Sequence, residues 1–183
     1  MSKIKLTHCS VKKIDGISIK GKSFELNTLK WVLKARSKDP SRLPLQCVLV
    51  EDDKGFPRFT CTDGRRLNSA IIEMIIEPGT YDVVLNTAKE VVLSQNEDVK
   101  YPNYKQVIPN TEGFKKIKNV CSDLVNLANF RIAKEFGVCV DYKYLADILS
   151  LKTSFDVYNE DELMPVVFKD GETMALLMPL RID

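Results

Sequence analysis

The chain has 183 residues, of which 44% are hydrophobic and 28% charged, a balance typical of a folded globular protein and not of a fibrous or disordered one. Its net charge of +2 does not by itself indicate a nucleic-acid partner. Five cysteines without a C-x-x-C pair and a single histidine, His8, argue against a disulfide framework or a zinc site. With no signal-peptide pattern and no run of 18 apolar residues, we expect a cytoplasmic protein without membrane contact.

The first part of the chain predicts an appendage followed by a mixed unit. Alternating polar and apolar residues around an Asp-Gly turn predict a β-hairpin over residues 1–22. A short strand and a helix are expected next, with Asn27 as the N-cap of the helix and Pro40 beyond its end. Three strand-like runs follow, LQCVLVED, FPRFTCTDG and RLNSAIIEMIIE. Residues 23–80 are therefore expected to form a βαβββ half.

The middle of the chain predicts a hairpin, a connector and a helix. Within residues 81–112, YDVVLN and EVVLSQN indicate two paired strands, and KYPNYKQVIPN is a proline-bounded extended connector. Apolar residues then recur at steps of three and four from Phe114 to Ala128, which predicts a helix over residues 113–129.

The last part of the chain repeats the order of the first. FGVCV and DYKYLADILSLK predict a strand and a helix, and SFDVYNE, LMPVVFKDGE and TMALLMPLRI predict three more strands. The apolar positions of the two helices match in spacing: Leu29, Val32 and Leu33 against Leu145, Ile148 and Leu149. This spacing could arise by chance, but the matching order of all five elements favours an internal duplication. We therefore predict an α+β protein, with the second half inside residues 113–183 and both halves in one compact unit.

Residues that could carry catalysis or hold a metal are poorly represented. The sequence contains none of the common hydrolase, nucleotide-binding or metalloprotease motifs, and one histidine in a polar leader is a poor general base. The acidic residues 159–162 and the pair Glu51 and Asp52 fall in predicted turns, where carboxylates are usually solvated. We expect no catalytic residue, no metal and no cofactor.

Basic residues around the first predicted helix form a candidate nucleic-acid surface. Lys30, Lys34 and Lys38 stand at i, i+4 and i+8, with Arg36 and Arg42 nearby. Such a stripe could contact the phosphates of duplex DNA without reading its sequence. The alternative is an ordinary solvated helix face.

Three short segments resemble the bacterial DNA polymerase III β sliding clamp, and they do so in the order of that family. TCTDGRRL resembles its TDGHRL loop, YPNYKQVIP resembles its FPDYRRVLP linker, and LLMPLRI resembles its VMPMRL ending. With the supporting strands, the likeness covers most of the chain from Ser23 onward. The resemblance implies a DNA-clamp-like fold, in which duplicated βαβββ halves place their helices on one face of antiparallel sheets.

The resemblance also implies a binding site. In the family these three segments converge on a hydrophobic pocket that receives short linear peptides from polymerases, loaders and repair proteins. The matching positions are Thr62, Arg65, Arg66, Leu67, Pro102, Val107, Leu176, Met178, Pro179 and Leu180. On this interpretation the arginines serve polar peptide groups at the rim and the apolar residues form the pocket. The alternative is that Val107, Leu176 and Met178 are ordinary core residues.

Departures from the family leave two functions open. A family member has three domains per chain and closes a ring as a dimer, whereas this chain offers about one domain's worth of βαβββ halves, and Arg65 replaces the loop histidine. The leading hypothesis is a non-enzymatic replication accessory protein that binds partner peptides and duplex DNA, as a monomer or a homo-oligomer. The rival is a stand-alone interaction module or decoy that binds clamp partners without encircling DNA.

Overall fold

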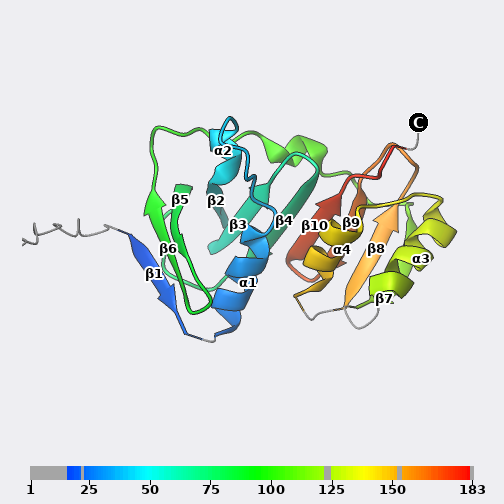
Figure 1. Cartoon of the computed structure of the whole chain (residues 1–183), viewed down its shortest axis with the longest axis horizontal. Coiled ribbons are helices and arrows are strands. Elements are labelled where there is room, and N and C mark those ends of the chain that lie inside the picture. The colour runs from blue at the N-terminus through cyan, green and yellow to red at the C-terminus, as the bar shows by residue number, and fades with distance from the viewer. Residues whose placement is uncertain (1–15, 22, 122–124, 152–153, 182–183) are drawn as a thin grey trace, which may run out of the picture.

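The computed structural model describes residues 16–21, 23–121, 125–151 and 154–181 of the chain. Among these residues, ten strands form one antiparallel sheet in the order β1-β6-β5-β2-β3-β4-β10-β9-β8-β7 (Figure 1). The strands are β1 (Ile17–Lys20), β2 (Val48–Asp53), β3 (Phe56–Thr62), β4 (Arg66–Ile71), β5 (Gly79–Asn86), β6 (Glu90–Gln95), β7 (Lys115–Val120), β8 (Phe155–Asn159), β9 (Val166–Asp170) and β10 (Thr173–Leu177). The helices are α1 (Phe24–Leu33), α2 (Leu43–Gln46), α3 (Val125–Phe136), α4 (Tyr142–Leu149) and the 3₁₀ turn η1 (Tyr104–Val107).

The predicted α+β class and the repeated order of a strand, helix and three strands are confirmed, but the first strand of each half is β1 or β7 and not the segment that the sequence predicted. The first half runs β1-α1-β2-β3-β4, with the short α2 before β2, and the second runs β7-α3-α4-β8-β9-β10. The last strands of the two halves, β4 and β10, pair with each other and join the halves into one sheet. The predicted hairpin β5–β6 is also present, and it lies between β1 and β2, whereas the corresponding strands β7 and β8 pair directly.

The helices α1, α4 and α3 cover one face of the sheet (Figure 1). The apolar positions expected on α1 and α4 are all buried in one core with the strands. At the centre of this core, the Trp31 ring stacks on Phe155, and its Nε1 donates a 2.7 Å hydrogen bond to the main-chain oxygen of Ile148. The indole therefore ties α1 to α4 without leaving a buried donor unpaired.

A second, smaller core lies on the opposite face. It contains Leu67, Tyr101, Tyr104, Val167 and Leu176, none of which belongs to the helix-side core. Since side chains alternate between the two faces along a strand, β9 and β10 are buried on both sides. The connector from residue 99 to 108 packs over this second core and shields its apolar side chains from water. The strands beneath therefore need the connector in this position.

Several predicted boundaries are wrong around α1. The helix begins after Ser23, whose hydroxyl caps the main-chain nitrogen of Leu26, and Asn27 lies inside the helix. The predicted strand at the start of this segment is therefore the first turn of the helix. The helix ends at Leu33, well short of Pro40, because the next three residues form tighter bonds to carbonyls three positions back. Residues 1–15 of the predicted N-terminal hairpin lie outside the described residues, and the remainder contains β1, which pairs with β6 at the sheet edge.

The predicted helix over residues 113–129 is correct only at its end, where α3 begins at Val125, and wrong in its first part. Its first part is strand β7, in which Ile117 and Val120 are both buried although they are three residues apart. The pairing with β8 shifts register between these two residues, and Asn119 there has a φ of 55°. A bulge inserts an extra residue and turns both side chains to the same face. This spacing imitates a helical pattern in the sequence.

The predicted strand FGVCV is not a strand. Phe136 is the last residue of α3, and Gly137 follows with a φ of 76° and a hydrogen bond from its nitrogen to the oxygen of Ala133. Glycine in this position is a common helix terminator. Val138 and Val140 are nevertheless buried, which explains why this irregular segment has an apolar sequence.

Candidate functional site

The seam between β4 and β10 is the floor of the candidate site. Leu67 on β4 and Leu176 on β10 are register partners, and both side chains are buried on the sheet face opposite the helices. Directly opposed side chains on neighbouring strands lie close enough to pack against each other. The two leucines therefore make a continuous apolar floor where the two halves of the chain meet.

A tight turn closes one end of this floor. The Asp63 carboxylate accepts hydrogen bonds from the main-chain nitrogens of Arg65 and Arg66 at 2.9 and 3.1 Å. The Thr62 hydroxyl donates to the oxygen of Arg66 at 2.7 Å, and Gly64 adopts a φ of 88° that favours glycine. The T-D-G sequence thus specifies the turn through its own side chains.

The connector forms the opposite wall and is anchored by two tyrosines. The Tyr101 hydroxyl accepts a 3.0 Å hydrogen bond from the nitrogen of Thr62, and the Tyr104 hydroxyl donates to Glu51 at 2.5 Å. Burial raises the pKa of both phenols. For Tyr104 the hydrogen bond to Glu51 adds to this effect, and its pKa rises to about 12. With both rings buried, the connector leaves Val107 exposed toward the seam.

These parts enclose one cavity of about 250 Å³. Its lining residues are Leu45, Thr62, Gly64, Arg65, Arg66, Leu67, Pro102, Asn103, Tyr104, Val107, Pro165, Leu176 and Met178. We call this cavity the docking pocket. Eight of the ten pocket positions proposed from the sequence line it, although they come from three distant segments of the chain.

Met178 reaches the docking pocket because its main-chain nitrogen donates to the oxygen of Arg65 at 2.9 Å. The remaining two proposed positions, Pro179 and Leu180, line a neighbouring hollow of about 380 Å³ instead. There the nitrogen of Leu180 donates to the oxygen of Cys139 at 2.7 Å. The C-terminal segment therefore separates two hollows, and only its first part contributes to the docking pocket.

Solved structures with the same architecture are bacterial replication proteins. The DNA polymerase III β subunit from Pseudomonas aeruginosa matches with a TM-score of 0.65 and 17% identity over 91% of this chain and 66% of its own. The β subunit from Thermotoga maritima gives a TM-score of 0.64 and 17% identity over 92% and 66%. The β sliding clamp from C. crescentus gives 0.62 and 19% over 92% and 65%. The chain has the fold of a shortened sliding clamp.

The likeness to sliding clamps lies in the three-dimensional structure more than in the sequence. The chain spans about two thirds of the length of the clamps it matches. No protein-family model and no curated protein sequence matches it. The comparison therefore establishes the clamp fold, and the function has to be argued from the site itself.

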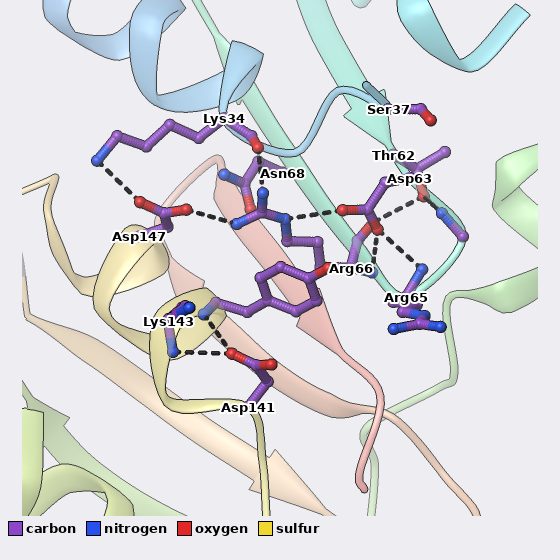
Figure 2. Close-up of polar contacts among 12 residues, drawn as sticks. Lys34, Ser37, Thr62, Asp63, Arg65, Arg66, Asn68, Asp141, Lys143 and Asp147 are labelled. Carbon is purple, nitrogen blue, oxygen red and sulfur yellow. Dashed lines mark hydrogen bonds and ion pairs between the residues drawn. The ribbon is translucent and has the colours of Figure 1, made fainter. Parts of the chain in front are cut away.

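The two arginines of the clamp-like loop have different surroundings (Figure 2). Arg65 is exposed at the mouth of the docking pocket. The Arg66 side chain is only 7% exposed, and its guanidinium pairs with Asp63 at 3.0 Å and with Asp147 on α4 at 2.7 Å. Arg66 therefore lines the docking pocket with other atoms, while its charged group is held behind the pocket wall.

Lys30, Lys34 and Lys38, which were predicted to share one face of the first helix, do not all lie on that helix. Because α1 ends at Leu33, Lys34 is its C-cap and Lys38 lies beyond it. Lys34 pairs with Asp147 at 3.3 Å and donates to Ser150 at 2.8 Å. Lys30 donates to the oxygen of Ala88, and Arg42 to the oxygen of Asp63 at 2.8 Å.

Arg36 and Lys38 complete the proposed basic set. Arg36 is half-buried and Lys38 is exposed, both in the segment between α1 and α2.

Within the described residues, no helix is long and apolar enough to cross a membrane, and no group of three metal-ligating side chains is found.

Sequence reasoning missed several walls of the docking pocket. Tyr104 and Asn103 lie inside the connector YPNYKQVIP, which resembles the clamp linker, so their position was a usable signal. Leu45 comes from α2 and Pro165 directly precedes β9, and no motif marks either of them. Both residues come close to the docking pocket only because strands that are distant in the sequence pair with each other.

Proposed function

We propose that this clamp-like chain is a non-enzymatic replication accessory protein that binds partner proteins through short linear peptides. The observation that supports this most directly is the docking pocket, where residues of all three clamp-like segments meet over an apolar floor. Concave apolar sites with a few polar groups at the rim are the usual form of ligand sites. Polymerases and other clamp-binding proteins are the partners that the clamp fold suggests.

The docking pocket suits a peptide with bulky apolar side chains. Leu67 and Leu176 are almost fully buried and shape the floor, whereas Val107 and Met178 remain 57% and 41% exposed at the walls. A ligand side chain that covers these two residues removes apolar surface from water, at roughly 25 cal/mol per Å². The unbranched Met178 can also adjust its rotamer to different ligands.

The proposal is tested by anisotropy of a fluorescent peptide that carries two bulky apolar residues. Val107→Asp and Met178→Asp place a charge on exposed walls, so the fold is retained while apolar binding is lost. We expect each variant to weaken binding at least tenfold. Phe130→Asp is the matched control, because this side chain is 62% exposed on α3 and absent from the docking pocket. Equal affinity in all four proteins would contradict the proposal.

DNA contact divides this proposal from its rival, a docking module or decoy without affinity for DNA. The rival is favoured by the intramolecular contacts of Lys30, Lys34 and Arg42, and by a net charge of only +2. Binding to a short duplex in low salt, measured with wild type and with Lys38→Ala, separates the two. Affinity that falls steeply with salt and in the variant supports DNA contact, and no binding at low salt supports the rival.

A further inference from the structure

Arg66 belongs to both faces of the sheet. Its main chain is part of the turn that borders the docking pocket, where its nitrogen donates to Asp63 and its oxygen accepts from Thr62. Its side chain extends to the helix-covered face and ends between α1 and α4 (Figure 2). Arg66 is the first residue of β4, and its side chain is linked to the turn through the pair with Asp63.

The guanidinium of Arg66 is held by four groups from three parts of the chain. Its Nε pairs with Asp63 of the turn at 3.0 Å, and one Nη donates to Asp147 of α4 at 2.7 Å. The other Nη donates to the main-chain oxygen of Lys34, one of the carbonyls that a helix end leaves without an intrahelical partner. The group also lies 4.1 Å from the ring centroid of Tyr144.

This arrangement makes the position of the pocket turn depend on α1 and α4. A charged group that is nearly removed from water requires its ionic and hydrogen-bonding partners. The planar fork of arginine can satisfy three acceptors at once, which the single ammonium group of lysine does not do in this geometry. Loss of one acceptor favours movement of the guanidinium toward water, and its remaining pair with Asp63 would move the turn with it.

We propose that Arg66 is a positioning residue, whose contacts with Asp147 and Lys34 hold the turn of the docking pocket in its binding geometry. We call this set of contacts the Arg66 latch. The inference rests on the proposed docking function, and it adds that groups outside the docking pocket, on the opposite face, determine its affinity. Asp147 lines no part of the docking pocket; its ionic partners are Arg66 and Lys34, and of these two only Arg66 lines it.

The test variant is Asp147→Asn, which removes a carboxylate but leaves Arg66 and the whole pocket lining in place. Asp156→Asn is the matched control, because the two carboxylates have similar exposure, 36% and 34%, and both form ion pairs, Asp147 with Arg66 and Lys34 and Asp156 with Lys116. Asp156 lies on β8 and its partner Lys116 on β7, at the far end of the sheet from β4. Three quantities are measured for each protein: peptide affinity, thermal midpoint, and hydrogen exchange of the Arg65 and Arg66 amides.

The latch predicts that Asp147→Asn weakens peptide binding about 3- to 10-fold, equivalent to roughly 0.7–1.4 kcal/mol. It also predicts faster exchange of the Arg65 and Arg66 amides, since their bonds to Asp63 open more often. Asp156→Asn should change neither quantity, even where both variants lower the thermal midpoint equally.

Unchanged exchange of the two amides in Asp147→Asn would overturn the latch, and so would unchanged peptide affinity in a protein that binds. A wild-type protein that binds no peptide refutes the docking function instead. The exchange measurement then still decides whether Asp147 positions the turn.

Discussion

Leu67 and Leu176 are register partners on the two strands that join the halves of the sheet, and together they form the floor of the docking pocket. One pair of side chains therefore serves both the cohesion of the fold and the proposed ligand site. Substitutions in the floor and in the walls are expected to have different consequences.

Leu176→Ala tests the floor. The side chain is 3% exposed and packs in the second, smaller core on the face opposite the helices. Its truncation should lower the free energy of unfolding by about 2–5 kcal/mol. Leu180→Ala is the matched control, because Leu180 is 51% exposed and its truncation should stay within about 0.5 kcal/mol. Urea denaturation followed by tryptophan fluorescence measures both. A small effect of Leu176→Ala would mean that the seam contributes little to stability.

The raised pKa of Tyr104 leads us to expect that the free energy of unfolding falls at alkaline pH. Burial and the hydrogen bond to Glu51 raise its pKa from 10.0 to about 12, so the folded state retains the phenolic proton more strongly than the unfolded state. This contribution is complete below pH 10 and is lost as pH rises toward 12, by roughly 1–3 kcal/mol.

Comparison with Tyr104→Phe isolates this contribution, because Cys47 and Tyr101 also have raised pKa values and titrate in both proteins. Wild type should be the more stable protein at pH 9, and the difference should shrink between pH 10 and 12. The measurement is urea unfolding at fixed pH values. A difference that stays constant over this range would refute the assigned pKa shift.

The position of Arg65 leads us to expect a preference for peptides that carry an acidic residue. Figure 2 shows the side chains of Arg65 and Arg66 leaving the turn in different directions, and Arg65 is the exposed one of the two at the rim of the docking pocket. Its guanidinium can therefore meet an acidic residue that flanks the apolar part of a peptide. Since exposed ion pairs are worth about 0.2–1 kcal/mol, Arg65→Ala should weaken binding of such a peptide by a factor of about 1.4 to 5.

The control for Arg65 is a peptide in which the acidic residue is replaced by its amide. Arg65→Ala should bind this neutral peptide with wild-type affinity, and added salt should reduce the difference between the peptides for wild type. Equal losses for both peptides would show that Arg65 acts through packing and not through its charge.

Local sequence patterns predicted much of the secondary structure but misplaced several boundaries. The spacing of Leu145, Ile148 and Leu149 located α4, because a helix repeats the same face every three to four residues whatever surrounds it. The same rule failed at Ile117 and Val120, where a bulge in β7 produces an equal spacing. That bulge is a property of the pairing with β8, so the pattern within one segment could not reveal it.

The sequence by itself determined the α+β class and, through resemblance in three short segments, most residues of the docking pocket. It also predicted the repeated βαβββ order, but it misplaced the first strand of each half. Tertiary structure alone decided that Leu45 and Pro165 complete the docking pocket and that the guanidinium of Arg66 lies behind it. Arg66 and Asp147 are 81 positions apart in the chain. Contacts of this kind depend on which strands pair and which helices pack together, and these relationships leave no local periodicity in the sequence.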